Sequence, residues 1–270
     1  MKLKASQIEQ YRRDGYLCPL PALTPDKAKH YLYEANDLQA RLGEKARPID
    51  MSQAHLHFGW AYDLVMHAVV LDAVEGVLGP NLIVWSSSLF PKKPHNPGYV
   101  SWHQDGTYWG LDSDEVATAW VALSNSTVEN GCMRVISGSH RMTYQPHEDT
   151  HHPDNLLSRG QELNVVVDET AAVDLALTAG QMSLHDVRMI HGSNPNRSDE
   201  NRVGFAIRYV TPNVSQTGHR PQAVLARGRD TGSHFELVDR PVDTVVDDAL
   251  AAMCQTVQQY AAGVSDTRCS

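Results

Sequence analysis

The sequence is poor in cysteine and lacks the long apolar segments of membrane-spanning and secreted proteins. Its four cysteines, Cys18, Cys132, Cys254 and Cys269, are scattered over 270 residues, and no Cys-x-x-Cys pair occurs. This spacing offers neither a zinc knuckle nor a disulfide framework. The first residues lack an apolar signal core, and no apolar run approaches the roughly 18 residues that span a bilayer. The sequence therefore predicts a reduced, cytoplasmic, soluble protein without a membrane partner.

Runs rich in lysine and arginine are also missing. The chain has 23 basic and 32 acidic residues and a formal net charge of −9. Nucleic-acid-binding domains usually carry a basic patch, so nucleic acid is not an expected partner. The hydrophobic content of 41% is ordinary for a globular protein. Because no repeat, low-complexity linker or change of composition divides the chain, we expect a single domain over residues 1–270; the sequence leaves its oligomeric state open.

The first third of the chain has the start and stop signals of helices. Thr24-Pro25-Asp26 combines a capping hydroxyl, a proline suited to the first helical position and an acidic residue. This signal predicts a helix over residues 25–42. A shorter helix capped by Ser6 is expected over residues 5–15, and a third over residues 61–78, where Gly79-Pro80 ends the apolar stripe. These helices, at about 5–78, should pack on the rest of the chain.

From residue 81 onward, short β-rich segments alternate with turn residues. This pattern is typical of a sandwich or a jelly-roll barrel. We therefore predict a mainly β fold with flanking helices, with a β core over about 81–240 and a final helix over about 244–262. Residues 143–162 are polar, rich in histidine and without a period, and we expect a binding loop or a solvated excursion there. The expected strands lie at 82–90, 116–123, 133–136, 163–167, 173–177, 181–185 and 202–210.

The most informative short pattern is His103-Gln104-Asp105. In a strand, side chains alternate between faces, so His103 and Asp105 would aim a ring nitrogen and a carboxylate oxygen at one point. With a second histidine from elsewhere, they would form the two-histidine, one-carboxylate face that binds ferrous iron and leaves positions open for oxygen and a cosubstrate. A solvated strand or turn would carry the same pattern without a metal.

A second segment supplies a candidate for the third ligand. His191 ends an apolar run, and Arg202 opens the most regular strand eleven residues later. Two antiparallel strands joined by a loop would bring this histidine close to that arginine. A guanidinium binds a carboxylate through two parallel hydrogen bonds. A dicarboxylate whose other end chelates iron would fit between the metal and Arg202.

These assignments have competitors in the same segments. Arg208 lies six residues beyond Arg202 and would share its face of the strand, so it competes for the carboxylate. His185 stands six residues before His191 and competes as a ligand, although we interpret it as structural. Arg202 could instead form a surface ion pair with Asp199 or its neighbour Glu200.

Together these segments resemble the phytanoyl-CoA dioxygenase family of iron(II)- and 2-oxoglutarate-dependent oxygenases. The resemblance spans most of residues 1–235 and rests on three ordered motifs. They are Trp102-His103-Gln104-Asp105, the segment from Asn130-Gly131 to Gly138-Ser139-His140, and His191-Gly192-Ser193-x-x-Asn196 followed by Arg202.

The resemblance implies a double-stranded β-helix, a bound Fe(II), 2-oxoglutarate as cosubstrate and O2 as oxidant. It implies His103, Asp105 and His191 as iron ligands, and Arg202 with Ser193 as the clamp on the distal carboxylate of 2-oxoglutarate. Trp120 and Leu89 fall near family positions that line the cosubstrate. Related halogenases replace the carboxylate ligand with a small residue, and Asp105 is present here. The expected outcome is therefore oxygenation, above all hydroxylation.

The substrate pocket is expected between the His103 strand, the 106–114 loop and the 143–162 loop. Tyr108 and Trp109 could form an aromatic wall that, with Asp112 or Asp114, holds a cation. Lys92, Lys93 and Arg134 could receive an anion. The alternative is that the two aromatic residues only pack and that the lysines Lys92 and Lys93 are solvated.

The sequence Trp102–Leu111 is similar to bacterial family members that hydroxylate small polar metabolites. The specific prediction is a 2-aminoethylphosphonate or its N-methylated form, hydroxylated at the carbon next to phosphorus, which would place the chain in phosphonate metabolism. Alternatives are a hydroxylase of a secondary metabolite or an amino acid, a non-catalytic binding protein and a metal-dependent hydrolase. A hydrolase has no use for the arginine clamp.

Overall fold

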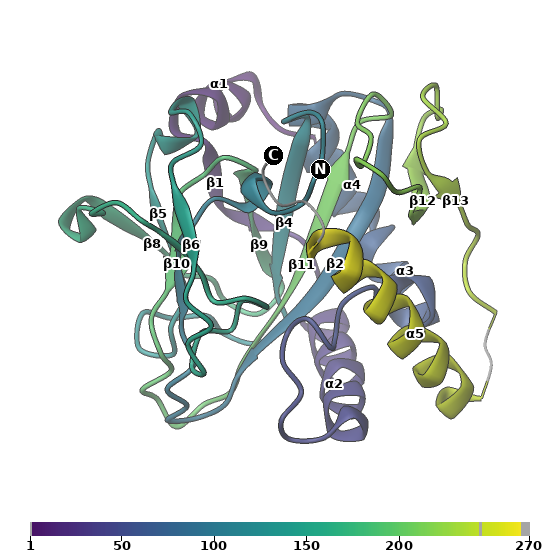
Figure 1. Cartoon of the computed structure of the whole chain (residues 1–270), viewed down its shortest axis with the longest axis horizontal. Coiled ribbons are helices and arrows are strands. Elements are labelled where there is room, and N and C mark those ends of the chain that lie inside the picture. Colours follow the sequence, from purple (N-terminus) through teal and green to yellow (C-terminus); the bar gives the residue numbers. More distant parts are fainter. Residues whose placement is uncertain (1, 243–244, 266–270) are drawn as a thin grey trace.

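Two facing, largely antiparallel sheets form the centre of the molecule (Figure 1). The computed structural model describes residues 2–242 and 245–265. The larger sheet has the strand order β1-β9-β4-β11-β2-β12-β13, and the smaller has the order β3-β10-β5-β8. The larger sheet comprises β1 (Tyr16–Pro21), β9 (Gln181–Asp186), β4 (Val116–Ala122), β11 (Arg202–Val210), β2 (Leu82–Lys92), β12 (Gln222–Arg227) and β13 (Glu236–Leu237). The smaller comprises β3 (Val100–His103), β10 (His191–Ser193), β5 (Met133–Ile136) and β8 (Ala172–Leu175).

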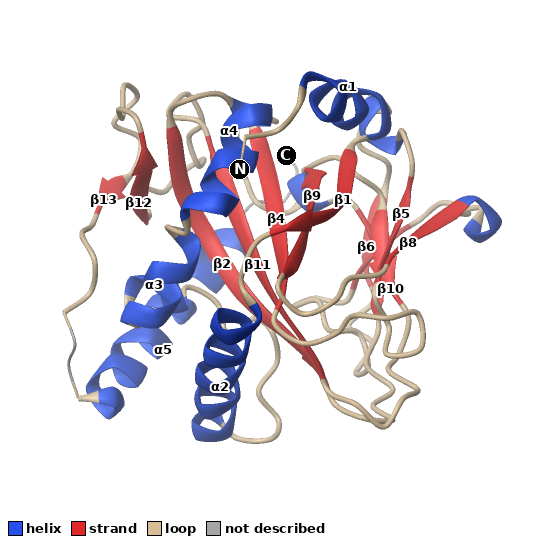
Figure 2. Ribbon diagram, turned by 180° about the vertical axis from the view of Figure 1, so that it is seen from behind, coloured by secondary structure: helices blue, strands red, loops and turns tan. Residues whose placement is uncertain are grey.

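Helices flank the larger sheet, as Figure 2 shows from behind. They are α1 (Ala5–Asp14), α2 (Pro25–Leu42), α3 (Gly59–Val65), α4 (Ala68–Leu78) and α5 (Val246–Ser265). Short 3₁₀ helices lie at Ala54–Leu56, Asp105–Thr107, Ser139–Arg141 and Glu169–Ala171. The predicted mainly β fold with flanking helices is confirmed, and its two facing antiparallel sheets are those of a jelly roll.

Strand β11 is buried along its whole length because it has a layer on each face. Val203, Phe205 and Ile207 belong to the core between the large sheet and the helices. Ala206 belongs to a separate core between the two sheets, together with Trp120 of β4. Since successive side chains of a strand point to opposite faces, Arg202, Gly204, Ala206 and Arg208 all face the space between the sheets.

Several local predictions differ from the structure. The helix expected over 61–78 is two helices, because His67 is extended (ψ 122°) and begins α4 as its N-cap. The strand expected over 163–167 ends at Leu163, and Val166 beyond it is fully exposed. Helix α1 begins at Ala5 with Lys4 as its cap, so Ser6 is not the cap. Residue 244, the expected start of the last helix, and Cys269 lie outside the described residues.

Residues 143–162 are more ordered than the sequence suggests. They contain β6 (His147–Asp149) and the start of β7 (Gln161–Leu163), which pair as a two-stranded antiparallel ribbon. The ribbon is bonded to β3, because Asn155 donates to the Ser101 hydroxyl (2.8 Å) and Ser101 donates to the Gln161 carbonyl. This segment therefore forms one wall beside the strand that carries His103.

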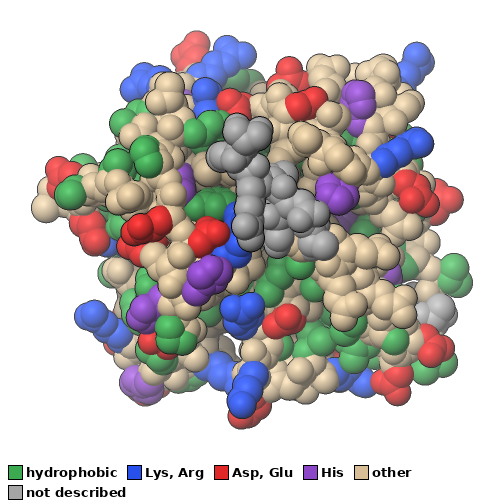
Figure 3. All heavy atoms as spheres, viewed as in Figure 1, with side chains coloured by type: hydrophobic (Ala, Val, Ile, Leu, Met, Phe, Trp, Pro, Cys, Tyr) green, Lys and Arg blue, Asp and Glu red, His purple; other side chains and the backbone are tan. Residues whose placement is uncertain are grey.

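None of the described helices combines the length and apolar character needed to cross a bilayer. Figure 3 shows acidic and basic side chains interspersed over one face of the molecule. The cysteines within the described residues, Cys18, Cys132 and Cys254, are free thiols.

The junction between α3 and β11 offers a test of how the helices are held on the sheet. The buried Tyr209 hydroxyl donates to the Val65 carbonyl at the end of α3 (2.7 Å). We expect Tyr209→Phe to lower the free energy of unfolding by about 1–2 kcal/mol, because a buried carbonyl loses its partner. Urea unfolding measures this change. The matched control is Tyr33→Phe, which removes a hydroxyl from a side chain that is 69% exposed and should cost far less.

Candidate metal centre

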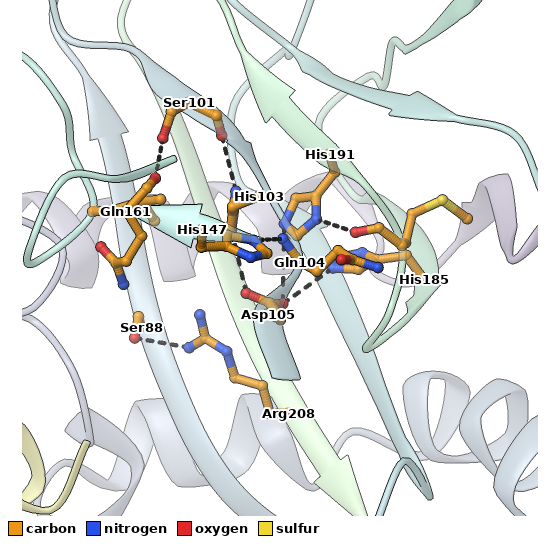
Figure 4. Close-up of polar contacts among 12 residues, drawn as sticks. Ser88, Ser101, His103, Gln104, Asp105, His147, Gln161, His185, His191 and Arg208 are labelled. Atoms are coloured by element: carbon orange, nitrogen blue, oxygen red, sulfur yellow. Dashed lines mark hydrogen bonds and ion pairs between the residues drawn. The ribbon is translucent and has the colours of Figure 1, made fainter. Parts of the chain in front are cut away.

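His103, Asp105 and His191 meet in the space between the sheets. His191 opens β10 and lies directly opposite His103 of β3 in the antiparallel ladder. Their ring centroids are 4.1 Å apart. Asp105 lies just beyond β3, and Gln104 keeps an extended backbone (φ −118°, ψ 125°), so the alternation of side chains continues to Asp105. One ligand atom from each residue lies within 4.8 Å of the others, and Figure 4 shows the three side chains converging.

The hydrogen bonds of the two histidines leave the right atoms free for a metal. His103 Nδ1 is 2.9 Å from the Ser101 carbonyl, and His191 Nδ1 is 2.9 Å from the Met189 carbonyl. A carbonyl only accepts, so each Nδ1 carries the proton and each Nε2 presents a lone pair. The Nε2 atoms face the Asp105 carboxylate at 3.3 Å for His103 and 4.0 Å for His191. Ligands about 2.1 Å from one metal at right angles would lie about 3 Å apart, so the residues fit an iron ion with little movement.

The charge states also suit a cation. Burial alone would raise the pKa of Asp105, but His191 and then His103 and His185 outweigh it and hold that pKa well below its usual value. Burial, and then the neighbouring His103, lower the pKa of His191 well below its usual value. Near neutral pH the site therefore presents an ionised carboxylate and a neutral imidazole, which are the forms that bind metal.

The triad opens into a chamber between the sheets. Strand β11 contributes Arg202, Ala206 and Arg208 to its lining, and Trp120 of β4 lies beside them. The side chain of Trp120 occupies the space above Gly204, where a Cβ atom would overlap the indole ring. Other lining residues are Pro48, Ile49, Ser52, Ser88, Phe90, Val100, Tyr108, Trp109, Thr118, Met133, Leu156, Leu157, Ser158, Gln161, His185, Gly192, Ser193 and Tyr260.

Two basic side chains lie at one corner of the chamber: Arg202 lines it, and the buried Lys92 contacts Ser193, which lines it too. Arg202 is 2% exposed, donates to the Gly131 carbonyl (2.9 Å) and lies 5.3 Å from the Trp120 ring centroid. The Lys92 amine donates to the Ser193 hydroxyl (2.7 Å) beside it. Burial lowers the pKa of Arg202 to about 10, and burial followed by the charge of Arg202 lowers that of Lys92 to about 5. Among the described residues neither has a carboxylate within ion-pair distance, so this corner suits an anion, whose charge would favour protonation of Lys92.

The route by which His191 and Arg202 come together differs from the one expected. The strands β10 and β11 are not neighbours in one sheet: β10 pairs with β3 and β5, whereas β11 pairs with β2 and β4. His191 and Arg202 instead face each other across the gap between two sheets. The loop that the sequence predicts between the two strands therefore joins strands of different sheets, and both residues line one chamber.

The structure separates the other predicted site residues into two groups. Tyr108, Trp109, Trp120 and Ser193 line the chamber. Leu89 does not, because it lies in the core between the large sheet and the helices. Its neighbour Phe90 takes the chamber position instead, as alternation along β2 requires.

Asp112, Arg134 and Lys93 also lie away from the chamber. Asp112 accepts hydrogen bonds from the backbone and hydroxyl of Ser215 (2.8 and 2.6 Å). Arg134 pairs with Glu169 (2.7 Å), on the face of β5 opposite to the chamber-lining Met133. The half-exposed Lys93 lies 3.7 Å from a carboxylate oxygen of Glu44.

Sequence reasoning named Lys92 and Arg208 as candidates to bind an anion, but it missed the hydroxyls of Ser88 and Thr118, which line the chamber. Alternation accounts for the two basic residues, because Arg208 shares the face of Arg202, and the neighbours Lys92 and Lys93 point to opposite sides. Nothing in the sequence around Ser88 and Thr118 indicates that their hydroxyls would line a chamber. Only the pairing of β2 and β4 with β11 brings Ser88 and Thr118 to this chamber.

One further contact between the 143–162 segment and the metal strand is made by a neutral histidine, His147. The backbone N–H of Gln104 donates to His147 Nε2 (3.0 Å), and His147 Nδ1 donates to the Gln145 carbonyl (2.7 Å). An imidazolium could not accept the first bond. Burial lowers the pKa of His147 to about 4, which keeps the ring neutral at ordinary pH.

This attachment predicts a pH dependence of stability. The unfolded chain takes up the His147 proton as the pH falls below about 6.5, whereas the folded chain resists it until about pH 4. His147 should therefore cost stability progressively between these values, by up to about 1.4 kcal/mol per pH unit. Urea unfolding of the wild type and of His147→Gln, which keeps an acceptor but does not titrate, measures this contribution. Equal slopes for both proteins would contradict it.

Known proteins resemble this chain in sequence and in fold. A family model described as phytanoyl-CoA dioxygenase (PhyH) matches residues 11–204. A probable alpha-ketoglutarate-dependent hypophosphite dioxygenase from Stutzerimonas stutzeri is 29% identical over 66% of this chain and 64% of its own length. The human peroxisomal phytanoyl-CoA dioxygenase is 25% identical over 53% of this chain and 43% of its own. The matches thus cover 43% to 64% of the length of these two curated relatives.

A solved structure shares nearly the whole fold. It is titled a non-heme monooxygenase, ThoJ, in its apo form. It is 37% identical in sequence, with a TM-score of 0.83, and the match covers 97% of this chain and 99% of that one.

Proposed function

Because this chain belongs to the phytanoyl-CoA dioxygenase family of Fe(II)- and 2-oxoglutarate-dependent dioxygenases, we propose that it hydroxylates an unactivated carbon of a small polar metabolite. The observation that carries this proposal is the pairing of two features in one chamber. A triad of two histidine nitrogens and one carboxylate shares the chamber with the buried Arg202, and neither Arg202 nor the buried Lys92 beside Ser193 has a carboxylate partner among the described residues. A keto dicarboxylate is the kind of molecule that would join the two.

In this proposal His103, Asp105 and His191 hold Fe(II) on one face. Ferrous iron with 2-oxoglutarate and O2 would supply the oxidising power for attack on a C–H bond. The chain supplies position: Arg202 and the Ser193 hydroxyl hold the distal carboxylate of the cosubstrate, and Lys92 orients that hydroxyl. Trp120 packs against Arg202 and shields this corner from water. Such dry surroundings strengthen the attraction between a guanidinium and a carboxylate.

The specific substrate we propose is a 2-aminoethylphosphonate or its N-methylated form, hydroxylated at the carbon next to phosphorus. Support comes from the relative named for hypophosphite, another phosphorus oxyanion, and from the cationic, partly aromatic lining of the chamber. Neither Arg134, Lys93 nor Asp112 takes part in this proposal. A hydroxylase of a secondary metabolite or an amino acid is the alternative, which the same cationic lining would serve if the anion were a carboxylate.

The metal assignment predicts a spectroscopic result. Anaerobic addition of Fe(II) and 2-oxoglutarate should produce the weak visible absorption of an iron–keto acid chelate. His191→Ala should abolish this band, because one of the three ligands is removed. The matched control is His140→Gln, since His140 is also buried but contacts the Arg12 carbonyl instead of the triad. If the wild type gave no band, a binding protein or a hydrolase would be favoured over an oxygenase.

The clamp assignment predicts that metal and cosubstrate binding can be separated. Arg202→Ala should weaken 2-oxoglutarate binding by tenfold or more, because a charge-assisted bidentate contact is lost. Iron binding should stay close to that of the wild type, because Arg202 does not touch the triad. Calorimetry with 2-oxoglutarate and metal analysis after dialysis measure the two affinities. Loss of iron with unchanged 2-oxoglutarate binding would contradict the assignment.

A further inference from the structure

A second buried cation lies in the chamber, apart from the cosubstrate corner. Arg208 is 7% exposed, and its only hydrogen-bond partner among the described residues is the Ser88 hydroxyl (2.8 Å). Its Nε atom has no partner within the same part of the chain. Aromatic rings flank its guanidinium, with Trp109 at 5.4 Å and Phe90 at 5.9 Å from their centroids. No carboxylate of the described residues lies within ion-pair distance of it, so they leave its charge uncompensated.

Uncompensated buried charge sets Arg208 apart from arginines outside the chamber, such as Arg134 and Arg227. Arg134 pairs with Glu169 and Asp174, and Arg227 pairs with Asp72 and Glu75. A buried charge without a partner is costly in free energy. Such a group is expected where a ligand supplies the missing charge.

Further unpartnered polar atoms surround the same part of the chamber. The hydroxyl of Thr118 is buried without a hydrogen-bond partner among residues 2–242 and 245–265, and Thr118 pairs with Arg208 across β4 and β11. Both line the chamber. Buried polar groups are almost always hydrogen-bonded. A guanidinium Nε–H and a hydroxyl left free side by side therefore form a set of donors without an acceptor.

The position of Arg208 distinguishes it from the cosubstrate corner. It lies six residues from Arg202 on the same face of β11, which places their Cα atoms about 20 Å apart along an extended strand. Between them, Gly204 and Ala206 carry no bulky side chain, and the Trp120 ring occupies the space above Gly204. In Figure 4 the Arg208 side chain extends from β11 toward the triad, on the side of Asp105 and Ser88. A molecule held by Arg208 would thus approach the metal from the end opposite to Arg202.

We propose that Arg208, with the hydroxyls of Ser88 and Thr118, binds an oxyanion on the substrate, a carboxylate or a phosphonate. This inference rests on the proposed function and names the substrate class. The planar guanidinium offers parallel donors to two oxygens of such a group. The flanking rings hold the guanidinium plane in place. The anion is thereby anchored beside the metal, and a carbon close to the anion is presented for oxidation.

The test measures anion binding with the cosubstrate corner already filled. Calorimetry is done on the anaerobic Fe(II) protein in saturating 2-oxoglutarate with 2-aminoethylphosphonate, methylphosphonate or propionate, and with 2-aminoethanol as a probe without an anion. We expect at least one anionic probe to bind and 2-aminoethanol to bind at least tenfold more weakly. The phosphonate and carboxylate arms show which oxyanion the site prefers.

Arg208→Gln should weaken binding of the preferred anion by tenfold or more, while the affinity for 2-oxoglutarate stays within about twofold of that of the wild type. The matched control is Arg134→Gln, which removes an arginine outside the chamber and should bind both ligands like the wild type. The proposal is overturned if no anionic probe binds the wild type, or if Arg208→Gln binds the anion as tightly as the wild type. It is equally overturned if this variant loses 2-oxoglutarate instead, since Arg208 would then be the cosubstrate clamp.

A second variant ensures that loss of anion binding is not mistaken for loss of the folded structure. Arg208→Met removes the uncompensated charge and should melt at or above the temperature of the wild type without ligand. The preferred anion should raise the melting temperature of the wild type and of the Arg134→Gln control, but not that of Arg208→Met. An equal rise in Arg208→Met would overturn the proposal. The same melting assay on metal-free protein separates this result from the proposed function, because anion binding there does not need an iron–keto acid chelate.

Discussion

The metal centre depends on the register between β3 and β10. His191 lies directly opposite His103 in that ladder, and each ring is fixed by a hydrogen bond from Nδ1 to a carbonyl two residues earlier. A shift of one residue would turn His191 to the outer face of the small sheet. Gly192 helps to keep this register, because a Cβ atom there would lie 2.9 Å from the Val100 carbonyl. The close approach of the two strands thus sets the distance between the two nitrogen ligands.

Strand β11 gives the chamber its opposite wall and joins it to the rest of the molecule. Its odd-numbered residues pack against the helices, and its even-numbered residues face the small sheet. The same nine residues therefore serve both stability and chemistry. Because both faces are covered, the arginines on the inner face are withdrawn from water. Their charges attract an anion more strongly than they would at the surface.

The chamber has one anionic ligand set and two separate basic regions, so metal, cosubstrate and substrate each have their own place in it. The carboxylate of Asp105 offers charge to a metal, Arg202 and Lys92 offer donors to a cosubstrate, and Arg208 offers charge to a substrate. Each region is incomplete without its ligand, since buried charges without partners lower stability. We infer that the protein gains stability as the chamber fills, by the linkage between binding and folding.

Much of the fold and the core of the site could be predicted from the sequence. The capping signal at Thr24-Pro25, the β-rich segments and the spacing of His103 and Asp105 are local patterns, and local backbone rules decide what they form. The position of Tyr108 and Trp109 at the chamber followed from their place just after the metal strand. Local patterns failed where a residue's surroundings come from another segment. Arg134, Lys93 and Asp112 have charges that suit a ligand, but Glu169, Glu44 and Ser215 lie beside them instead.

Which side chains share a face of a strand follows from the sequence alone, because alternation along a strand is a property of the backbone. The sequence could not determine which strands face each other. The packing of the two sheets places His191 and Arg202 on opposite sheets and brings Ser88 and Thr118 to Arg208. It also buries Lys92 while leaving its neighbour Lys93 half exposed. Burial and the absence of a nearby carboxylate among the described residues turn an ordinary arginine into an anion receptor, and both arise only from packing between distant segments.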